Sequence, residues 1–225
     1  MTRMYIRSYS PLGALLIAEG NADMTAPSSL WSANTYGTAV LTTDTWHHLA
    51  YTSEGVTGGA VVLYIDGISV STGTGKDLAT VPDPVFVRLA IKPASTDRVA
   101  CNFDEIAIFD DVLTPGEVTA IYNGGAPTDI TSHSGIQTYW RMGDAPGDTA
   151  TLIRDQVGHW DLNGADGTPV LDADVPEWLD ETSMYFDGVD DNISTTDGWP
   201  ELAASGSGYT VAYWFKANLP MVSST

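Results

Sequence analysis

Residues 60–71 read AVVLYIDGISVS, and this stretch decides the fold class. Val61, Leu63 and Ile65 alternate with the residues between them, which is the period of two expected of a strand with one face in the core. Asp66-Gly67 follows at once and separates this run from a second β-prone run, as in a two-residue type I′ hairpin. The stretch therefore predicts two antiparallel strands joined by a tight turn.

Short apolar-rich runs of the same kind recur on both sides of this hairpin. Turn-forming Gly, Pro, Asn, Asp and Ser residues separate them, and such spacing is typical of β-sandwiches. The further runs lie at residues 4–9, 14–19, 38–42, 46–51, 85–91, 102–109, 139–141, 184–186 and 209–217. The predicted fold class is all-β, a sandwich of two sheets.

One short helix is predicted near residues 114–123. Thr114-Pro115-Gly116-Glu117 offers an N-cap threonine, a proline at the first helical position and a glutamate three residues after the cap. Apolar residues follow at 118, 121 and 122, and Gly124-Gly125 ends the helix. This capping box is a structural device, so we expect no catalytic role for Glu117.

The composition limits the functions open to the chain. Its 225 residues carry 29 acidic against 9 basic side chains, a formal net charge of −20. Such a surface repels phosphate backbones and anionic membrane faces, which excludes nucleic-acid and lipid-headgroup binding. No run approaches the ~18 apolar residues of a membrane span, and 43% hydrophobic residues are too many for a disordered chain. The one cysteine, Cys101, cannot form an intrachain disulfide, and we expect it to be a small buried side chain.

Four segments in the first half, taken together, carry a family resemblance. They are WHHLA at residues 46–50, LYIDG at 63–67, FDEIAIF at 103–109, and the helix with Leu113, Thr114, Glu117 and Val118. In this order they resemble the concanavalin A-like lectin/glucanase superfamily, in its laminin G-like and pentraxin-like branch. The resemblance implies a jelly-roll sandwich of two antiparallel sheets.

The second half resembles the opening of the same family, so the family order is inverted. The matching segments are TYWRMGD at 138–144, IRDQVG at 153–158, SMYFDGVDD at 183–191 and YTVAYWFK at 209–216. We therefore divide the chain into a C-terminal sandwich portion (1–126), an acidic connecting segment with the opening strand (127–182) and N-terminal sandwich strands (183–225). Three explanations stay open: a circular permutant closed on itself, a chain that gives its second half to a neighbour, and a piece of a longer tandem array.

No catalytic pattern is evident. Hydrolases of this superfamily carry E-x-D-x-x-E on one strand, which places acids on one face, and the sequence lacks that pattern. Asp104 and Glu105 are adjacent, so on a regular strand we expect them to face opposite ways, and the same holds for His47 and His48. The chain is predicted not to be an enzyme, with a glycan-active hydrolase kept as an alternative.

The resemblance also implies a calcium site. Many sandwiches of the superfamily hold a structural Ca²⁺ between their opening and closing strands, which here carry Asp187, Asp190 and Asp191 on one side and Asp104 on the other. Carboxylates gathered at one point repel each other unless a cation neutralises them. We therefore expect Ca²⁺ as a cofactor. The alternative is that Asp187-Gly188 forms a turn and the two later aspartates face solvent.

Sugar binding requires exposed aromatic rings beside short polar side chains. The aromatic residues in or beside predicted loops are Trp31, Tyr36, Trp160, Trp178 and Trp199. Each of these rings could instead cap an end of the sandwich, so both interpretations stay open.

Two functions follow from these features, because this fold hosts lectins, hydrolases and scaffolds alike. The first is a non-catalytic binding or adhesion module for a glycan or cell-surface partner. The alternative is a bacteriophage virion protein, a decoration or tail protein, whose partners are copies of itself or other virion proteins. Residues 1–10 lack the apolar core of a signal peptide, and virion proteins leave cells without one. We therefore expect an extracellular or virion-surface location.

Overall fold

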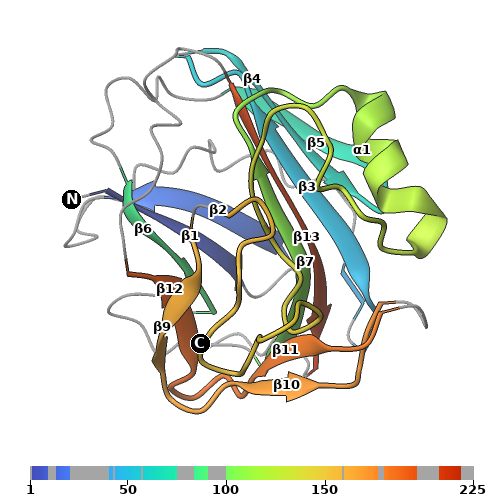
Figure 1. Ribbon diagram of the computed structural model, residues 1–225. Coiled ribbons are helices and arrows are strands. Elements are labelled where there is room, and N and C mark those ends of the chain that lie inside the picture. The colour runs from blue at the N-terminus through green and yellow to red at the C-terminus, as the bar shows by residue number, and fades with distance from the viewer. Residues whose placement is uncertain are drawn as a thin grey trace.

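The structure is a computed structural model, and it describes residues 2–9, 14–20, 41–42, 44–56, 58–74, 84–90, 100–158, 160–176, 180–196 and 208–218. Within these residues the chain forms two β-sheets and one short α-helix (Figure 1). None of the helices in this described part combines the length and apolar character needed to cross a bilayer.

The larger sheet has eight strands and is antiparallel throughout. Its path runs β10 (Val170–Asp172), β11 (Ser183–Phe186), β7 (Cys101–Phe109), β13 (Tyr209–Ala217), β3 (His47–Ser53), β4 (Ala60–Ile65) and β5 (Ile68–Thr74). β13 pairs with β7 along its whole length. The other edge of β7 is therefore shared by β11, at its beginning, and by β8 (Ile136–Trp140), at its end.

The smaller sheet has five strands. Their order is β2 (Ala14–Gly20), β1 (Thr2–Tyr9), β6 (Pro84–Leu89), β12 (Asn192–Thr195) and β9 (Leu162–Asp166). The predicted all-β sandwich is confirmed, but the pair β1–β6 is parallel rather than antiparallel. A parallel pair needs a long crossover, and the chain between β1 and β6 supplies one by passing through β3, β4 and β5 of the other sheet.

The hairpin that decided the fold class has the predicted turn. Asp66 (φ 51°) and Gly67 (φ 76°) both adopt the left-handed conformation that a type I′ turn requires. Gly67 also allows close packing, because a Cβ there would lie 2.9 Å from Cδ1 of Tyr122. The turn thus fits against the helix, and β4 and β5 pair directly on either side of it.

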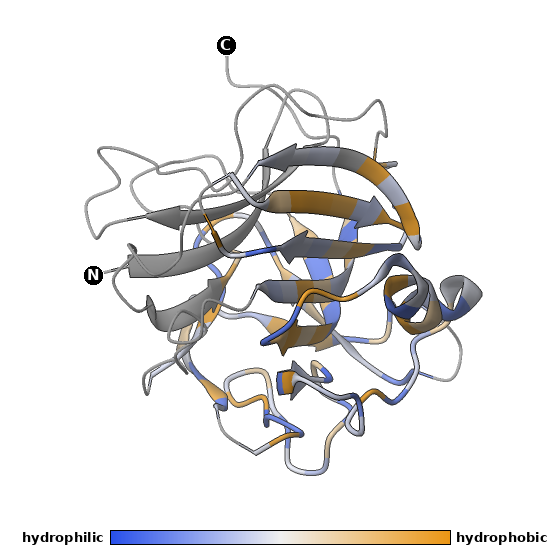
Figure 2. Cartoon of the chain, turned by 90° about the horizontal axis from the view of Figure 1, so that it is seen from above, coloured by the Kyte–Doolittle hydropathy of each residue, from blue (hydrophilic) through white to orange (hydrophobic). Residues whose placement is uncertain are grey.

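Apolar side chains of the two sheets meet in one core, and hydrophobic residues run along the strands (Figure 2). The smaller sheet contributes Leu89, Leu162 and Ile193, all fully buried. Against them lie large side chains of the larger sheet, which are Tyr51, Phe103, Ile106, Ile108, Phe186, Tyr209, Tyr213 and Phe215. Cys101 is buried in the same core, in agreement with its predicted role.

Helix α1 (Pro115–Tyr122) covers the outer face of the larger sheet (Figure 1). Val118 and Ile121 of the helix pack there against a second apolar cluster, which includes Ala107 and Ala212 of the sheet. The predicted capping box is present: the Thr114 hydroxyl accepts the Glu117 N–H at 3.3 Å, and the Glu117 carboxylate accepts the Thr114 N–H at 2.7 Å. The helix ends at Asn123 in the left-handed conformation, followed by a 3₁₀ turn over Asn123–Gly125.

Strands from the second half of the chain complete the sheets begun by the first half. β13 lies between β7 and β3, and β12 lies between β6 and β9. The segment 127–182 is more than a connection, because it supplies β8, β9 and β10. Strands from both halves of the chain therefore lie side by side in each sheet.

Candidate metal centre

A bulge in β7 creates the candidate site. The register of β7 against β13 shifts between Ala212 and Trp214, so that Glu105 and Ile106 together stand opposite Tyr213. Glu105 has a φ of 47°, the left-handed backbone found at some bulges. One extra residue is thus inserted in β7, and the alternation of side chains breaks there.

This bulge overturns the expectation that Asp104 and Glu105 face opposite ways. Phe103 and Ile106, which flank the two acids, both pack in the core between the sheets. Asp104 and Glu105 are left together on the other side, and their carboxylate oxygens lie within 4.8 Å of each other. The prediction that the two side chains point to opposite faces was wrong because it assumed a regular strand.

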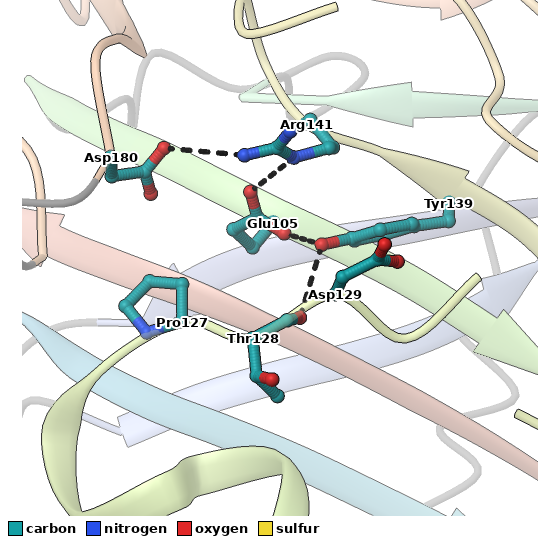
Figure 3. Close-up of a pocket in the computed structure, with 7 residues that line it drawn as sticks. All are labelled: Glu105, Pro127, Thr128, Asp129, Tyr139, Arg141 and Asp180. Atoms are coloured by element: carbon teal, nitrogen blue, oxygen red, sulfur yellow. Dashed lines mark hydrogen bonds and ion pairs between the residues drawn. The ribbon is translucent and has the colours of Figure 1, made fainter. Parts of the chain in front are cut away.

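A third acid, Asp180, comes from the second half of the chain, just before β11. Its carboxylate lies within 4.8 Å of both Asp104 and Glu105, and all three residues are buried. Arg141 directly follows β8. Because β8 and β11 share one edge of β7, both segments reach the bulge (Figure 3). We call Asp104, Glu105 and Asp180 the acidic cluster.

One guanidinium group faces an excess of carboxylates here. Arg141 Nε donates to Glu105 Oε1 at 3.0 Å and Nη2 donates to Asp144 Oδ2 at 3.1 Å, while Asp180 Oδ1 is 4.0 Å from Nη2. The Tyr139 hydroxyl donates to the second oxygen of Glu105 (Figure 3). With Asp104 included, four carboxyl groups gather around the single guanidinium group of Arg141.

Three buried oxygens of the acidic cluster receive no hydrogen bond from an N–H or hydroxyl group of the described residues. Asp104 Oδ1 accepts the Glu105 N–H at 2.8 Å, but Asp104 Oδ2 and both oxygens of Asp180 have only carboxyl groups as partners, since the Asp180 side chain lies within hydrogen-bonding reach of Asp104 and Asp144. Asp104 is fully buried and Asp180 is 7% exposed. Burying a charged group without a partner is costly, so such oxygens point to a missing positive partner.

The same crowding raises the pKa of each member of the cluster. Burial, together with the charges of Asp180 and Glu105, holds the pKa of Asp104 well above its usual range. Burial raises the pKa of Asp180 to about 8, with Asp144 and Glu105 adding to the effect. Burial raises the pKa of Glu105 to about 7 although the Arg141 guanidinium opposes the shift. Each carboxyl group thus resists ionisation beside the others unless a cation joins them.

A small hollow opens beside the cluster (Figure 3). Its lining consists of Glu105, Pro127, Thr128, Asp129, Tyr139, Arg141 and Asp180. The volume is about 50 Å³, enough for an ion or a water molecule or two. A sugar ring does not fit, because pockets for ligands of that kind measure roughly 300–1,000 Å³.

The other predicted calcium ligands form a separate group. Asp187, Asp190 and Asp191 have carboxylate oxygens within 4.8 Å of one another, and the first two are exposed. Asp191 accepts the N–H groups of Thr168 at 2.5 Å and Asp187 at 2.9 Å, while Asp187 accepts the Val189 N–H. Backbone N–H groups thus occupy the Asp187 and Asp191 carboxylates, and Asp191 is buried, whereas the alternative interpretation had it facing solvent.

Asp104 does not join that second group. Phe186, just before Asp187, pairs with Cys101, whereas Asp104 lies farther along β7. The opening and closing strands are therefore neighbours, as the resemblance implied, but the structure divides the four predicted aspartates between two sites.

A comparison with protein families agrees with this architecture. Residues 13–119 match the family model described as the concanavalin A-like lectin/glucanases superfamily. This stretch is similar to that superfamily. Searches of curated proteins and of solved structures found no match. The superfamily match ends before residues 138–217, where the resemblance to the family's opening strands remains a prediction.

Most of the predicted sugar-binding aromatics lie outside the described residues. These are Trp31, Tyr36, Trp178 and Trp199. Trp160 is half-buried and packs against the core, and its carbonyl accepts the Trp140 Nε1–H at 2.7 Å. In the structure Trp160 therefore stands at the core boundary.

Sequence reasoning missed Asp180, Arg141 and Tyr139 as members of one site. Asp180 follows no pattern, and Arg141 was noted only as part of a superfamily-like strand. A signal did exist in the charge imbalance: Arg141 is one of few basic residues in an acidic segment, and an isolated cation there marks a place where carboxylates gather.

Proposed function

We propose that the chain is a non-catalytic binding module for a glycan or cell-surface partner, and that its acidic cluster binds one Ca²⁺ ion. The observation that carries the cation is the set of buried oxygens on Asp104 and Asp180 that receive no N–H or hydroxyl hydrogen bond and face other carboxyl groups. The superfamily match supports a binding module in general.

The donor chemistry favours a hard divalent cation. The acidic cluster offers only carboxylate oxygens, and Ca²⁺ binds about 6–8 oxygen ligands, often including water. Softer metals select nitrogen and sulfur, which the cluster does not offer. The hollow has room for water molecules that would complete the coordination. When bound, Ca²⁺ would neutralise the carboxylates of the cluster, with Arg141 and Tyr139 fixing the Glu105 carboxylate.

The size of the hollow supports the non-catalytic part of the proposal. Glycoside hydrolysis needs two carboxyl groups on opposite sides of a sugar bond. The acidic cluster lies instead beside a volume of about 50 Å³, where no sugar ring fits between its members. A glycan or protein partner would therefore bind elsewhere on the sandwich, with the cation acting on stability.

Isothermal titration of the EDTA-treated chain with CaCl₂ tests the cation site. We expect one site, and Asp104→Asn should weaken its affinity at least about tenfold, because neutralising even a supporting ligand costs roughly 10–100-fold. The matched control is Asp190→Asn in the exposed group, which should leave the affinity unchanged. A loss of binding in the control but not in Asp104→Asn would place the ion in the other group.

A glycan array and a cell-binding assay test the partner. The calcium-loaded chain should bind a defined set of glycans or a cell type, and its reducing-sugar release on the same glycans should equal that of buffer. Measurable hydrolysis would contradict the non-catalytic assignment. Failure to bind any glycan or cell type would contradict the proposed partner class.

A further inference from the structure

We infer that Thr42 is an acyl-acceptor site, at which His47 removes the hydroxyl proton and Asp66 orients the His47 ring, and that it reacts with activated esters of the aryl class. This inference goes beyond the proposed binding function and is independent of the cation site. The reaction consumes Thr42, with one acyl group taken up per chain, and leaves glycans uncleaved.

The three side chains form a continuous row of hydrogen bonds. Thr42 Oγ1 lies 2.9 Å from His47 Nε2, and His47 Nδ1 lies 2.8 Å from Asp66 Oδ2. A hydroxyl group becomes a nucleophile when it lies within hydrogen-bond reach of an imidazole that a third group holds in orientation. The row therefore has the order of groups that acyl transfer to a hydroxyl requires.

The backbone of Thr42 fixes the tautomer of the His47 ring. The Thr42 N–H, which can only donate, is directed at Nε2 at 3.3 Å, so Nε2 carries a lone pair instead of a hydrogen. Nδ1 therefore carries the ring hydrogen and donates it to Asp66 Oδ2, and the Thr42 hydroxyl donates to Nε2. In this tautomer Nε2 is the atom that accepts the hydroxyl proton.

Backbone hydrogen bonds hold the three groups in place. Asp66 stands in the turn between β4 and β5, where its N–H donates to the His48 carbonyl at 2.8 Å and its Oδ1 accepts the His48 N–H at 2.9 Å. With Oδ1 bonded to the backbone, Oδ2 faces the His47 ring. The turn that precedes β3 is tied to the end of β13, because the Asp44 N–H donates to the Ala217 carbonyl at 2.8 Å.

The exposure of these groups suits a reaction with a molecule from solvent. Thr42 is exposed, whereas the His47 side chain is only 13% exposed. An ester can thus reach the hydroxyl while the base is largely shielded. Thr42 Oγ1 bonds to the acyl carbon as the bond from that carbon to the aryl oxygen breaks, and the hydroxyl proton passes through His47 Nε2 to the departing oxygen. Aryl esters suit this step because a phenol oxygen is a good leaving group.

Incubation of the full chain with p-nitrophenyl acetate, followed by peptide mass spectrometry, tests the inference. The acetyl group should be found on Thr42, Thr42→Val should abolish this labelling, and Thr42→Ser should retain it. His47→Gln should slow the labelling by at least about 100-fold, the lower end of what a general base contributes. Thr131→Val is the matched control and should leave the rate unchanged, because the exposed Thr131 hydroxyl donates to Asp129 Oδ1 at 2.7 Å and not to a histidine.

Asp66→Asn tests the orienting role separately from folding. Asn-Gly is a favoured pair in a type I′ turn, so the hairpin should persist. Because Oδ1 accepts the His48 N–H, the introduced amide nitrogen takes the place of Oδ2 and donates to His47 Nδ1. Nitrogen NMR should then show the ring hydrogen on Nε2 instead of Nδ1, and labelling of Thr42 should slow by at least about tenfold.

Three results would overturn the inference. Acetyl groups on amines but not on Thr42 would show that the hydroxyl is not activated. Equal release of nitrophenol by the unsubstituted chain and Thr42→Val, with loss in His47→Gln, would show that the imidazole attacks the ester itself. An unchanged tautomer and rate in Asp66→Asn would show that Asp66 does not orient the ring. Each of these results leaves the calcium titration and the glycan-binding assay unaffected, so the proposed function stands or fails separately.

Discussion

Glu105 holds a backbone conformation that is uncommon for a residue with a side chain. Its φ of 47° lies in the left-handed region, where a Cβ is disfavoured. Arg141 and Tyr139 compensate by donating to its two carboxylate oxygens. A glycine would relax the backbone but would lose both hydrogen bonds. The strain is therefore retained at a position where the carboxylate makes contacts that glycine cannot make.

Arg141 provides the first test at this scale. Arg141→Met removes the one cation beside the buried Glu105 and Asp144 carboxylates and should lower the free energy of unfolding by about 1–3 kcal/mol. This range lies below that of fully buried pairs because the Arg141 side chain is 35% exposed. Urea denaturation measures the change.

Arg154 is the matched control for Arg141. Its ion pair with Asp161 spans 3.7 Å and both side chains are substantially exposed, so Arg154→Met should change the free energy of unfolding by less than about 1 kcal/mol. Equal losses in the two variants would show that the buried carboxylates do not depend on Arg141.

His48 makes stability depend on pH. Burial lowers its pKa to about 4, although the Asp66 carboxylate opposes the shift, and the ring packs beside both Trp214 and Tyr122. Because the unfolded side chain titrates near pH 6.5, the unfolded state takes up the proton first as pH falls. The contribution of His48 to stability is therefore lost between about pH 6.5 and 4, by about 3 kcal/mol in total. The raised pKa values of Glu105 and Asp180 act in the opposite direction over this range.

Urea denaturation across that pH range, in EDTA, measures the His48 contribution. His48→Gln should remove the His48 contribution to this part of the slope, whatever constant change in stability the substitution causes. His133→Gln, at a half-buried ring that contacts Phe109, should preserve the slope. An unchanged slope in His48→Gln would rule out the buried ring as its source.

At the scale of elements, the start of α1 offers a direct test. Thr114→Ala removes the hydroxyl that accepts the Glu117 N–H and should lower the free energy of unfolding by about 1 kcal/mol. Glu117→Gln keeps an oxygen that accepts the Thr114 N–H, so its loss should be smaller. Thermal denaturation ranks the two, and the opposite ranking would contradict the capping box as the source.

The elements that could be predicted from the sequence are those with local signals. The Asp66-Gly67 turn and the capped helix each depend on a few neighbouring residues, and both are present in the structure. The bulge in β7 could not be predicted, because it appears only when β7 is aligned against β13, about 100 residues later. The acidic cluster depends on that bulge and on Asp180. The sequence therefore led us to place Asp104 in one calcium site with Asp187, Asp190 and Asp191 instead.

On the scale of the whole molecule, the net charge of −20 opposes compactness. Raising NaCl from about 0.1 M to about 1 M shortens the Debye length from about 10 Å to about 3 Å, so the free energy of unfolding should increase. Urea denaturation at the two concentrations measures the increase. CaCl₂ at matched ionic strength should increase the free energy of unfolding further than NaCl does, and Asp104→Asn should remove this additional increase. If the two salts have the same effect, general screening alone explains it.

The position of β13 has a consequence for how the protein is made. β13 lies between β3 and β7, yet its residues Tyr209–Ala217 are synthesised after both neighbours. At bacterial and eukaryotic elongation rates, roughly 10–30 s pass between completion of β3 at Ser53 and arrival of β13. Until β13 emerges, the edges of β3 and β7 that it will pair with remain unpaired. Folding of this sandwich is therefore completed only after residues Tyr209–Ala217 have emerged, and factors that shield nascent strand edges should raise its yield.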